Sequence, residues 1–208
     1  LEFRRVLFRS GASTGSGEAV DLRDGTAAFG GLDVSRAVAA VNGEIAGALR
    51  GLDAADQETV DRRLIALDGT PAKSRLGGNA LIAVSMATAH AAAAARGIPL
   101  WRHLAGDRAP GHLPLPEIQI FGGGAHANRR VDVQDFMVIA TGADDFATAL
   151  DWTAEVYRHA GRMLAEAGRL AGVADEGGYW PVVDTNEEAL DFLVRAIERA
   201  GFTPGEEI

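Results

Sequence analysis

The chain contains no cysteine, no long uninterrupted hydrophobic run and no cluster of basic residues. The lack of cysteine excludes disulfides and thiolate chemistry and is compatible with a cytoplasmic protein. No apolar run reaches the ~20 residues of a membrane-spanning helix, and the alanine run 91–95 is too short. A formal charge of −9 argues against a nucleic-acid partner. We therefore expect a cytoplasmic protein that neither binds nucleic acid nor spans a membrane.

Residues 1–9 (LEFRRVLFR) differ in composition from the rest of the chain. They are basic and aromatic, whereas the chain as a whole is acidic. They lack the long apolar stretch and the small-residue cleavage site of a targeting peptide. We interpret residues 1–9 as a non-native leader without a functional role.

Apolar periodicity predicts three helices in the first half of the chain. The first helix carries one apolar face and ends near Gly51; that face is formed by Val34, Val38, Val41, Ile45 and Leu49. The second carries Val60, Leu64 and Leu67 and ends at Gly69. The third, residues 79–96, is rich in alanine and stops at Gly97 and Pro99.

Strands and helices alternate in the second half, after a proline-rich boundary at residues 110–116. Two strands are predicted, one marked by Leu113, Leu115, Ile118 and Ile120 and one over residues 131–140. A long helix opens at Asp144 and Asp145 and ends at Gly168, with four residues expected inward: Phe146, Leu150, Tyr157 and Leu164. A strand over residues 170–174 follows, then a helix capped by Thr185 and Glu188. This order predicts the start of an α/β barrel.

Two glycine-containing segments carry side chains suited to acid–base chemistry. Residues 123–127 (GGAHA) present His126 on a close-packed loop, and the following strand carries Gln134 and Asp135. A tight turn with a solvated histidine is an equally good interpretation of the loop alone. In residues 175–178 (DEGG), Glu176 stands next to a second carboxylate, which favours protonation of one of the pair.

Four sets of motifs, in order, resemble the enolase family. They cover the chain from residue 10 to its end and lie at 10–15 (SGASTG) with 18–25 (EAVDLRDG), 67–70 (LDGT) with 73–80 (KSRLGGNA), 123–137, and 175–178 with 186–190 (NEEAL). Each tetrapeptide alone is weak, but their shared register is specific. The chain is identified on these residues as a member of that family.

The resemblance implies an α/β fold and two domains. Residues 10–109 would be the helical part of a small α+β N-terminal domain, and residues 110–208 the first part of an enolase-type TIM-like barrel. These last 99 residues fall short of the ~250 of a complete eightfold barrel. We therefore expect a fragment that stops before the family's metal carboxylates and its lysine base, and that is inactive alone.

The resemblance also implies roles for individual residues. Glu176 would be the acid that protonates the leaving hydroxyl, and Asp135 would take the place of a functional carboxylate that also contacts substrate. His126 and Gln134 would bind substrate, and Ser13 would ligate Mg²⁺ from a flexible loop.

Several residues depart from the family pattern. Asp135 replaces the usual glutamate, Gly122 stands where asparagine is usual, and Glu117 and Gln119 make the first barrel strand unusually polar. Residues 179–181 (YWP) replace the usual Phe-Ala-Pro, which would put a bulky ring beside the site. These changes suggest a divergent paralogue.

The implied activity is that of a hydro-lyase, enolase or phosphopyruvate hydratase. It would dehydrate 2-phospho-D-glycerate, a phosphorylated carboxylate, to phosphoenolpyruvate in glycolysis and gluconeogenesis, as a homodimer or larger assembly. One alternative is a paralogue that acts on a related phospho- or phosphono-carboxylic acid in specialised metabolism. Another is a non-catalytic binding protein.

Overall fold

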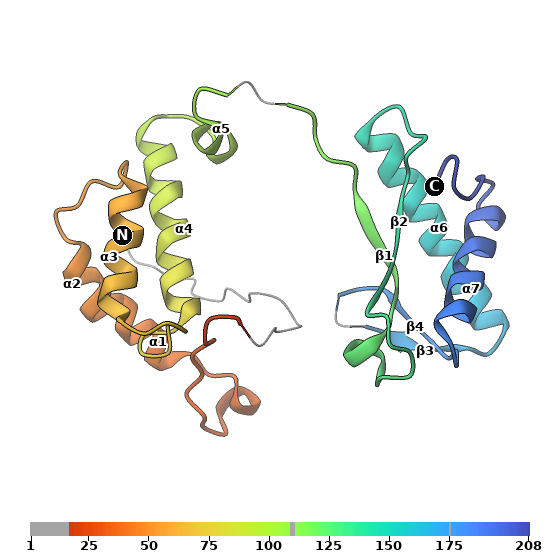
Figure 1. Cartoon of the computed structure of the whole chain (residues 1–208), viewed down its shortest axis with the longest axis horizontal. Coiled ribbons are helices and arrows are strands. Elements are labelled where there is room, and N and C mark those ends of the chain that lie inside the picture. Colours follow the sequence, from red (N-terminus) through yellow and green to blue (C-terminus); the bar gives the residue numbers. More distant parts are fainter. Residues whose placement is uncertain (1–16, 109–110, 175) are drawn as a thin grey trace. The chain divides into compact units, whose positions relative to one another are not determined.

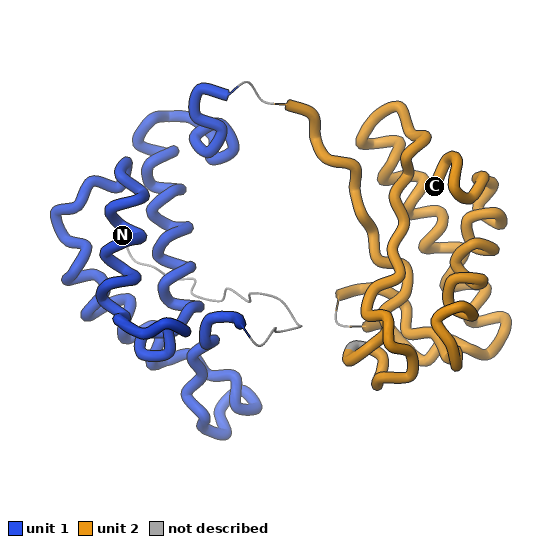
Figure 2. The backbone as a smooth tube through the Cα atoms, in the orientation of Figure 1, with its two compact units in different colours: residues 1–110 blue, residues 111–208 orange. Residues whose placement is uncertain are grey.

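A computed structural model describes residues 17–108, 111–174 and 176–208. The chain forms two compact units, Leu1–Pro110 and Gly111–Ile208 (Figure 2). Each unit has a hydrophobic core of its own.

Unit 1 is helical in its described part (Figure 1). Its elements are η1 (Ala28–Gly31), α1 (Ser35–Ala40), the π-helical η2 (Val41–Ile45), α2 (Ala46–Leu49), α3 (Gln57–Asp68), α4 (Gly78–Ala95) and α5 (Leu100–Ala105). The three predicted helices are confirmed, although the first is divided by the π-helical turn. The short helix α5 was not predicted.

The core of unit 1 is built by the predicted helix faces. Val41 and Ile45 of η2 pack with Val60 and Leu64 of α3. The helix α3 ends at Gly69, whose backbone is left-handed (φ 71°), a conformation that glycine adopts without the clash of a Cβ. The spacing of apolar residues therefore predicted the buried stripe, and Gly69 marked the end of the helix.

Two family-like motifs of unit 1 contact each other. The Asn79 side chain accepts from the backbone N–H of Leu22 and donates to the carbonyl of Leu22, both at 3.1 Å. A Cβ at Gly77 would lie 2.5 Å from the Leu22 Cβ, and one at Gly78 would lie 2.8 Å from the Ala19 Cβ. The glycines at 77 and 78 thus let the 19–22 segment approach the start of α4, which gives both motifs a structural role.

The helix α4 is long and apolar enough to cross a membrane by length and composition. Seven of its residues are nevertheless buried within unit 1: Gly78, Asn79, Ala80, Leu81, Val84, Ala92 and Ala93. Because Ala80, Leu81 and Val84 belong to the core of unit 1, we interpret α4 as a core helix.

Unit 2 combines a four-stranded sheet with two long helices in its described part. Its elements are β1 (Glu117–Gly122), η3 (Gly124–Ala127), β2 (Asp135–Ile139), α6 (Phe146–Glu166), β3 (Leu170–Val173), β4 (Tyr179–Pro181) and α7 (Asn186–Arg199). The strand order is β2-β1-β4-β3. The pairs β1–β2 and β3–β4 are antiparallel, whereas β1 and β4 are parallel. Only the parallel pair is joined through a helical crossover, as parallel pairing requires.

The strand β1 begins later than we predicted. Leu113 and Leu115 are exposed and precede the strand. Pro114 and Pro116 supply no backbone N–H, so this stretch cannot form a full ladder of hydrogen bonds. The prolines therefore override the apolar alternation.

The helices α6 and α7 lie side by side against one face of the sheet (Figure 1). The buried face of α6 is made mostly of small residues: Ala149, Thr153, Val156, Ala160, Gly161 and Leu164. The prediction for Leu164 is confirmed, but Phe146 and Leu150 are 38% and 41% exposed, so their inward placement was wrong. Small residues let the helix approach the sheet closely. The prediction placed large apolar side chains inward and therefore missed this packing.

Both predicted helix starts in unit 2 are confirmed at the level of their caps. The Asp145 carboxylate accepts from the backbone N–H of Thr148 at 2.8 Å, and the Thr185 hydroxyl accepts from that of Glu188 at 3.1 Å. The Glu188 carboxylate accepts from the N–H of Asp184 at 2.9 Å. The second cap therefore closes one residue earlier than the usual reciprocal box.

Candidate active site

The candidate site lies on the face of the sheet that α6 and α7 do not cover. The opposite, helix-covered face contributes Ile120, Phe136 and Val138 to the core. Successive side chains of a strand point to opposite faces, so Gln119, Asp135 and the 42% exposed Met137 share the helix-free face. The polar side chains of β1 and β2 are thereby gathered on one surface.

Gln119 joins the predicted carboxylates of the site. Its Nε2 donates a hydrogen bond to Asp135 Oδ1 and another to Glu176 Oε2, the latter at 3.5 Å. Gln134 Nε2 donates to Asp135 Oδ2 at 3.1 Å. Two residues proposed from sequence, Asp135 and Glu176, therefore contact one glutamine that we had not assigned, and Gln134 joins them through Asp135.

Glu176 is exposed and lies in the turn between β3 and β4. The turn is closed by two backbone hydrogen bonds, from Ala174 N–H to the carbonyl of Gly178 at 2.8 Å and from Gly177 N–H to that of Ala174 at 2.9 Å. Gly177 has φ 98°, which favours glycine there. The first glycine of the motif thus serves the turn that presents Glu176.

The loop of residues 123–127 packs tightly against the segment before β2. Gly123 N–H donates to the Gln134 carbonyl at 2.6 Å, and a Cβ at Gly123 would lie 2.0 Å from the Val133 carbonyl oxygen. Only glycine fits this contact. His126 belongs to η3, which begins at Gly124, but its side chain is outside what the structure describes.

The ring of Tyr179 is directed toward α6 and not toward the carboxylates. It stacks on Tyr157 with 4.2 Å between ring centroids and lies against Gly161. Burial, together with a hydrogen bond with Tyr157, raises the pKa of Tyr179 to about 12. The ring of Tyr179 is therefore not the bulky ring that we expected beside the site. By strand alternation, Trp180 stands on the opposite face of β4, the face that carries Gln119.

Ser13 and Asp175 lie outside the described residues, so nothing is added to their predicted roles. Within the described ranges, no group of three or more His, Cys, Asp or Glu side chains could hold a metal ion. Gln119 was missed because the polarity of its strand was taken as a departure from the family pattern. A glutamine between two isoleucines in a strand was the available signal.

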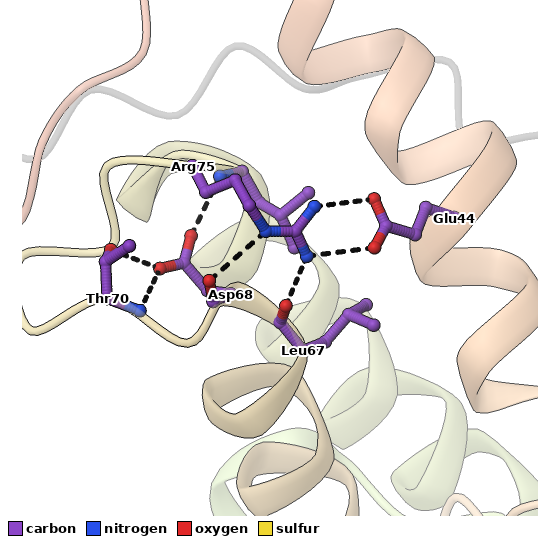
Figure 3. Close-up of polar contacts among 6 residues, drawn as sticks. Glu44, Leu67, Asp68, Thr70 and Arg75 are labelled. Carbon is purple, nitrogen blue, oxygen red and sulfur yellow. Dashed lines mark hydrogen bonds and ion pairs between the residues drawn. The ribbon is translucent and has the colours of Figure 1, made fainter.

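The motif at residues 67–70 also contains a carboxylate, but it forms a structural network in unit 1 (Figure 3). Asp68 is 2% exposed; its side chain accepts from the N–H of Leu76 at 2.8 Å, the N–H of Thr70 at 3.0 Å and the Thr70 hydroxyl. Burial raises the pKa of Asp68, but these hydrogen bonds together lower it below its ordinary 3.8.

Arg75 completes this network. It donates to the Asp68 carbonyl at 3.2 Å, to the Leu67 carbonyl, and to both carboxylate oxygens of Glu44 at 2.9 Å. The guanidinium therefore ties the end of α3 to η2 (Figure 3). We assign this motif to the stability of unit 1.

Comparison with protein families agrees with the two units. A family model described as enolase, N-terminal domain, matches residues 2–104, and one described as enolase, C-terminal TIM barrel domain, matches residues 111–208. The α/β fold predicted from the motifs, with enolase-type TIM barrel sequence in the second half of the chain, is thereby confirmed. These domains are those of lyase-type enzymes that bind phosphorylated small molecules and typically use Mg²⁺. Because the two matches span nearly the whole chain, it belongs to the enolase family.

Proposed function

We propose that this chain supplies the leaving-group side of an enolase active site, for dehydration of 2-phospho-D-glycerate to phosphoenolpyruvate. The proposal is supported by the cluster in which Gln119 contacts both Asp135 and Glu176. Membership of the enolase family supports the reaction class. The enzyme would be a cytoplasmic hydro-lyase of glycolysis and gluconeogenesis, assembled as a homodimer or larger.

Glu176 is proposed as the general acid. The reaction removes a proton from the carbon next to the carboxylate and a hydroxyl from the neighbouring carbon, which leaves a carbon–carbon double bond and water. Hydroxide leaves poorly, so a carboxylic acid must donate a proton to the hydroxyl oxygen as the carbon–oxygen bond breaks. The exposure of Glu176 on a turn suits contact with a bound substrate.

Gln134, Asp135 and His126 are proposed to bind and orient the substrate. Gln134 is held through its carbonyl by Gly123 and through its amide by Asp135, so its position is fixed from two sides. Such preorganisation is what a positioning residue requires.

Mg²⁺ is proposed as the cofactor because the family typically uses it, with Ser13 as one ligand. In this reaction type the metal stabilises the negative charge that develops on the substrate carboxylate. The described residues do not form a site for it.

The test is an assay of a polypeptide in which this chain is joined to the remaining strands of an enolase barrel. The described sheet has four strands, whereas a complete barrel has eight. We expect Mg²⁺-dependent formation of phosphoenolpyruvate from 2-phosphoglycerate. No product from a folded, Mg²⁺-loaded barrel would overturn the proposal. The 208-residue chain alone is expected to give no turnover.

A second candidate is a paralogue that uses a related phospho- or phosphono-carboxylic acid. Trp180 favours it, because strand alternation puts this large ring on the face of Gln119. Asp135, one methylene shorter than glutamate, points the same way. In that case Asp135→Glu should not raise turnover of 2-phosphoglycerate in the joined barrel, whereas Trp180→Ala should change the preference between the substrates.

A further inference from the structure

The peptide unit between Gly177 and Gly178 is held from both sides. Its carbonyl accepts a hydrogen bond from the Tyr157 hydroxyl at 2.8 Å, and its N–H donates to Gln119 Oε1 at 2.9 Å. The carbonyl and the N–H of one planar peptide point in opposite directions. Two contacts from opposite sides therefore resist rotation of this plane, which is separated from Glu176 by a single residue, Gly177.

Gln119 lies on the central strand between Asp135 and the turn that carries Glu176. In the order β2-β1-β4-β3, β1 lies between the strand of Asp135 and the strand that follows the Glu176 turn. The contacts also fix the orientation of the amide: Oε1 faces the N–H of Gly178, and Nε2 faces the two carboxylates. The reverse orientation would set the amide oxygen against Asp135 and Glu176.

Glycines make room for both side chains that hold this peptide, Gln119 and Tyr157. A Cβ at Gly178 would lie 2.6 Å from Gln119 Oε1, so the second glycine of the 175–178 motif admits the glutamine. On the other side, a Cβ at Gly161 would lie 2.3 Å from the ring of Tyr179, which stacks on Tyr157. The ring of Tyr157 is thus held by a neighbour that itself fits only against a glycine.

We propose that Gln119 and Tyr157 are positioning residues that clamp the Gly177–Gly178 peptide and so fix the carboxyl group of Glu176 relative to Asp135. This inference rests on the proposed function, because it gives the fixed carboxyl group a catalytic purpose. Gln119 sets the position from the sheet, and Tyr157 sets it from α6.

The first test measures hydrogen exchange of the Gly178 amide in the 208-residue chain by NMR. Gln119→Met removes the acceptor and should make this exchange about tenfold faster, the effect of one lost hydrogen bond. Tyr157→Phe keeps the ring and should give a smaller acceleration. Gln57→Met is the matched control, because Gln57 makes a similar side-chain network in unit 1 and should leave Gly178 unchanged.

The second test measures kcat and KM in the joined barrel. Gln119→Met and Tyr157→Phe should lower kcat about 10- to 100-fold with little change in KM, because the proposed acid acts on the leaving group and not in ground-state binding. Gln119→Glu separates the two contacts of the glutamine. It can still accept from Gly178, so exchange should stay slow, but it presents a negative charge to both carboxylates and kcat should fall.

The outcomes separate this inference from the proposed function. Unchanged exchange at Gly178 in Gln119→Met would show that the clamp does not exist in solution. Faster exchange with unchanged kcat would show that the clamp does not position Glu176. An unsubstituted barrel without activity would count against the proposed function, and the exchange measurement would still decide whether the clamp is present.

Discussion

The two units each contain an acidic residue in a glycine-containing motif, and they use it in opposite ways. Asp68, in unit 1, is 2% exposed, and its carboxylate accepts from three donors of its own chain. Glu176, in unit 2, is exposed on a turn and accepts from the neutral amide of Gln119 at 3.5 Å. The first carboxylate closes a loop, whereas the second is presented to solvent.

The difference shows why a motif alone does not identify a reactive group. A buried carboxylate is tolerated only when hydrogen bonds replace its lost water, and those bonds leave little capacity for a ligand. An exposed carboxylate carries no such requirement. The surroundings, and not the residue type, separate the structural acid from the candidate catalytic acid.

The largest expected effect is that of Glu176→Gln in the joined barrel. The amide cannot donate an acidic proton to the leaving hydroxyl, so kcat should fall about 10²- to 10⁴-fold. Because Glu176 is exposed, thermal stability should hardly change. Steady-state assays and thermal unfolding test both halves of this prediction. Full activity in the variant would remove Glu176 from the mechanism.

Asp68→Asn, in contrast to Glu176→Gln, should lower the stability of its unit. The amide group would face backbone donors that now bind the carboxylate, so unit 1 should lose about 2–4 kcal/mol of stability. Hydrogen exchange of the buried amides of α3 and α4 measures this loss, with those of α6 as an internal reference. Asp107→Asn, at an exposed aspartate of the same unit, is the matched control and should change stability by less than about 0.5 kcal/mol.

Lowering the pH should reduce the contribution of Asp68 to the stability of unit 1. The pKa of this carboxyl group is lowered in the folded state, so its stabilising effect is complete above 3.8 and is lost as the pH falls through the folded pKa. The difference in unfolding free energy between the wild type and Asp68→Asn should therefore shrink below about pH 4. Glu44 and Asp56, whose pKa values are also lowered, are present in both proteins. A difference that stays constant down to pH 2 would contradict this assignment.

Much of the scaffold could be predicted from local sequence. Helix stripes, caps and glycine stops depend on neighbours within a few residues, which is why α3 and α4 were predicted with their ends and α7 with its start. The inward face of α6 was partly wrong, because the sheet accepts small residues there in preference to Phe146 and Leu150. That preference depends on the packing distance between two elements, which no local pattern records.

The sequence predicted the carboxylates of the candidate site but not the residues that position them, Gln119 and Tyr157. Gln134, Asp135 and Glu176 stood out because their motifs resemble a known family. Gln119 contacts Glu176, which is 57 residues away in sequence, and Tyr157 contacts Gly177, which is 20 residues away. The strand order brings the first pair together, and the position of α6 brings the second. Such contacts follow from topology, so a glutamine in a strand and a tyrosine in a helix looked like ordinary surface and core residues.

The smallest expected effect concerns Tyr179, where burial is the largest cause of a pKa raised from 10.0 to about 12. At Asp68 hydrogen bonds outweigh burial, whereas at Tyr179 both favour the protonated form. The stability contributed by the neutral phenol is therefore complete below pH 10 and is lost as the pH rises through 12. The chain has two tyrosines, so in Tyr157→Phe the alkaline absorbance reports Tyr179 alone. Most of the rise should remain in that variant, because burial persists when the partner hydroxyl is gone.

Gly161→Ala, combined with Tyr157→Phe, tests the cause directly. The added Cβ would lie 2.3 Å from the ring of Tyr179, so the ring must leave its place against α6 and the pKa of Tyr179 should return toward 10. Ala160→Gly, at the neighbouring buried position of the same helix, is the control for a general loosening of α6. If the raised pKa survived in the Gly161→Ala protein, burial against this glycine would not be its origin. The contrast between a unit that buries its acid with hydrogen bonds and one that buries its phenol by packing would then fail.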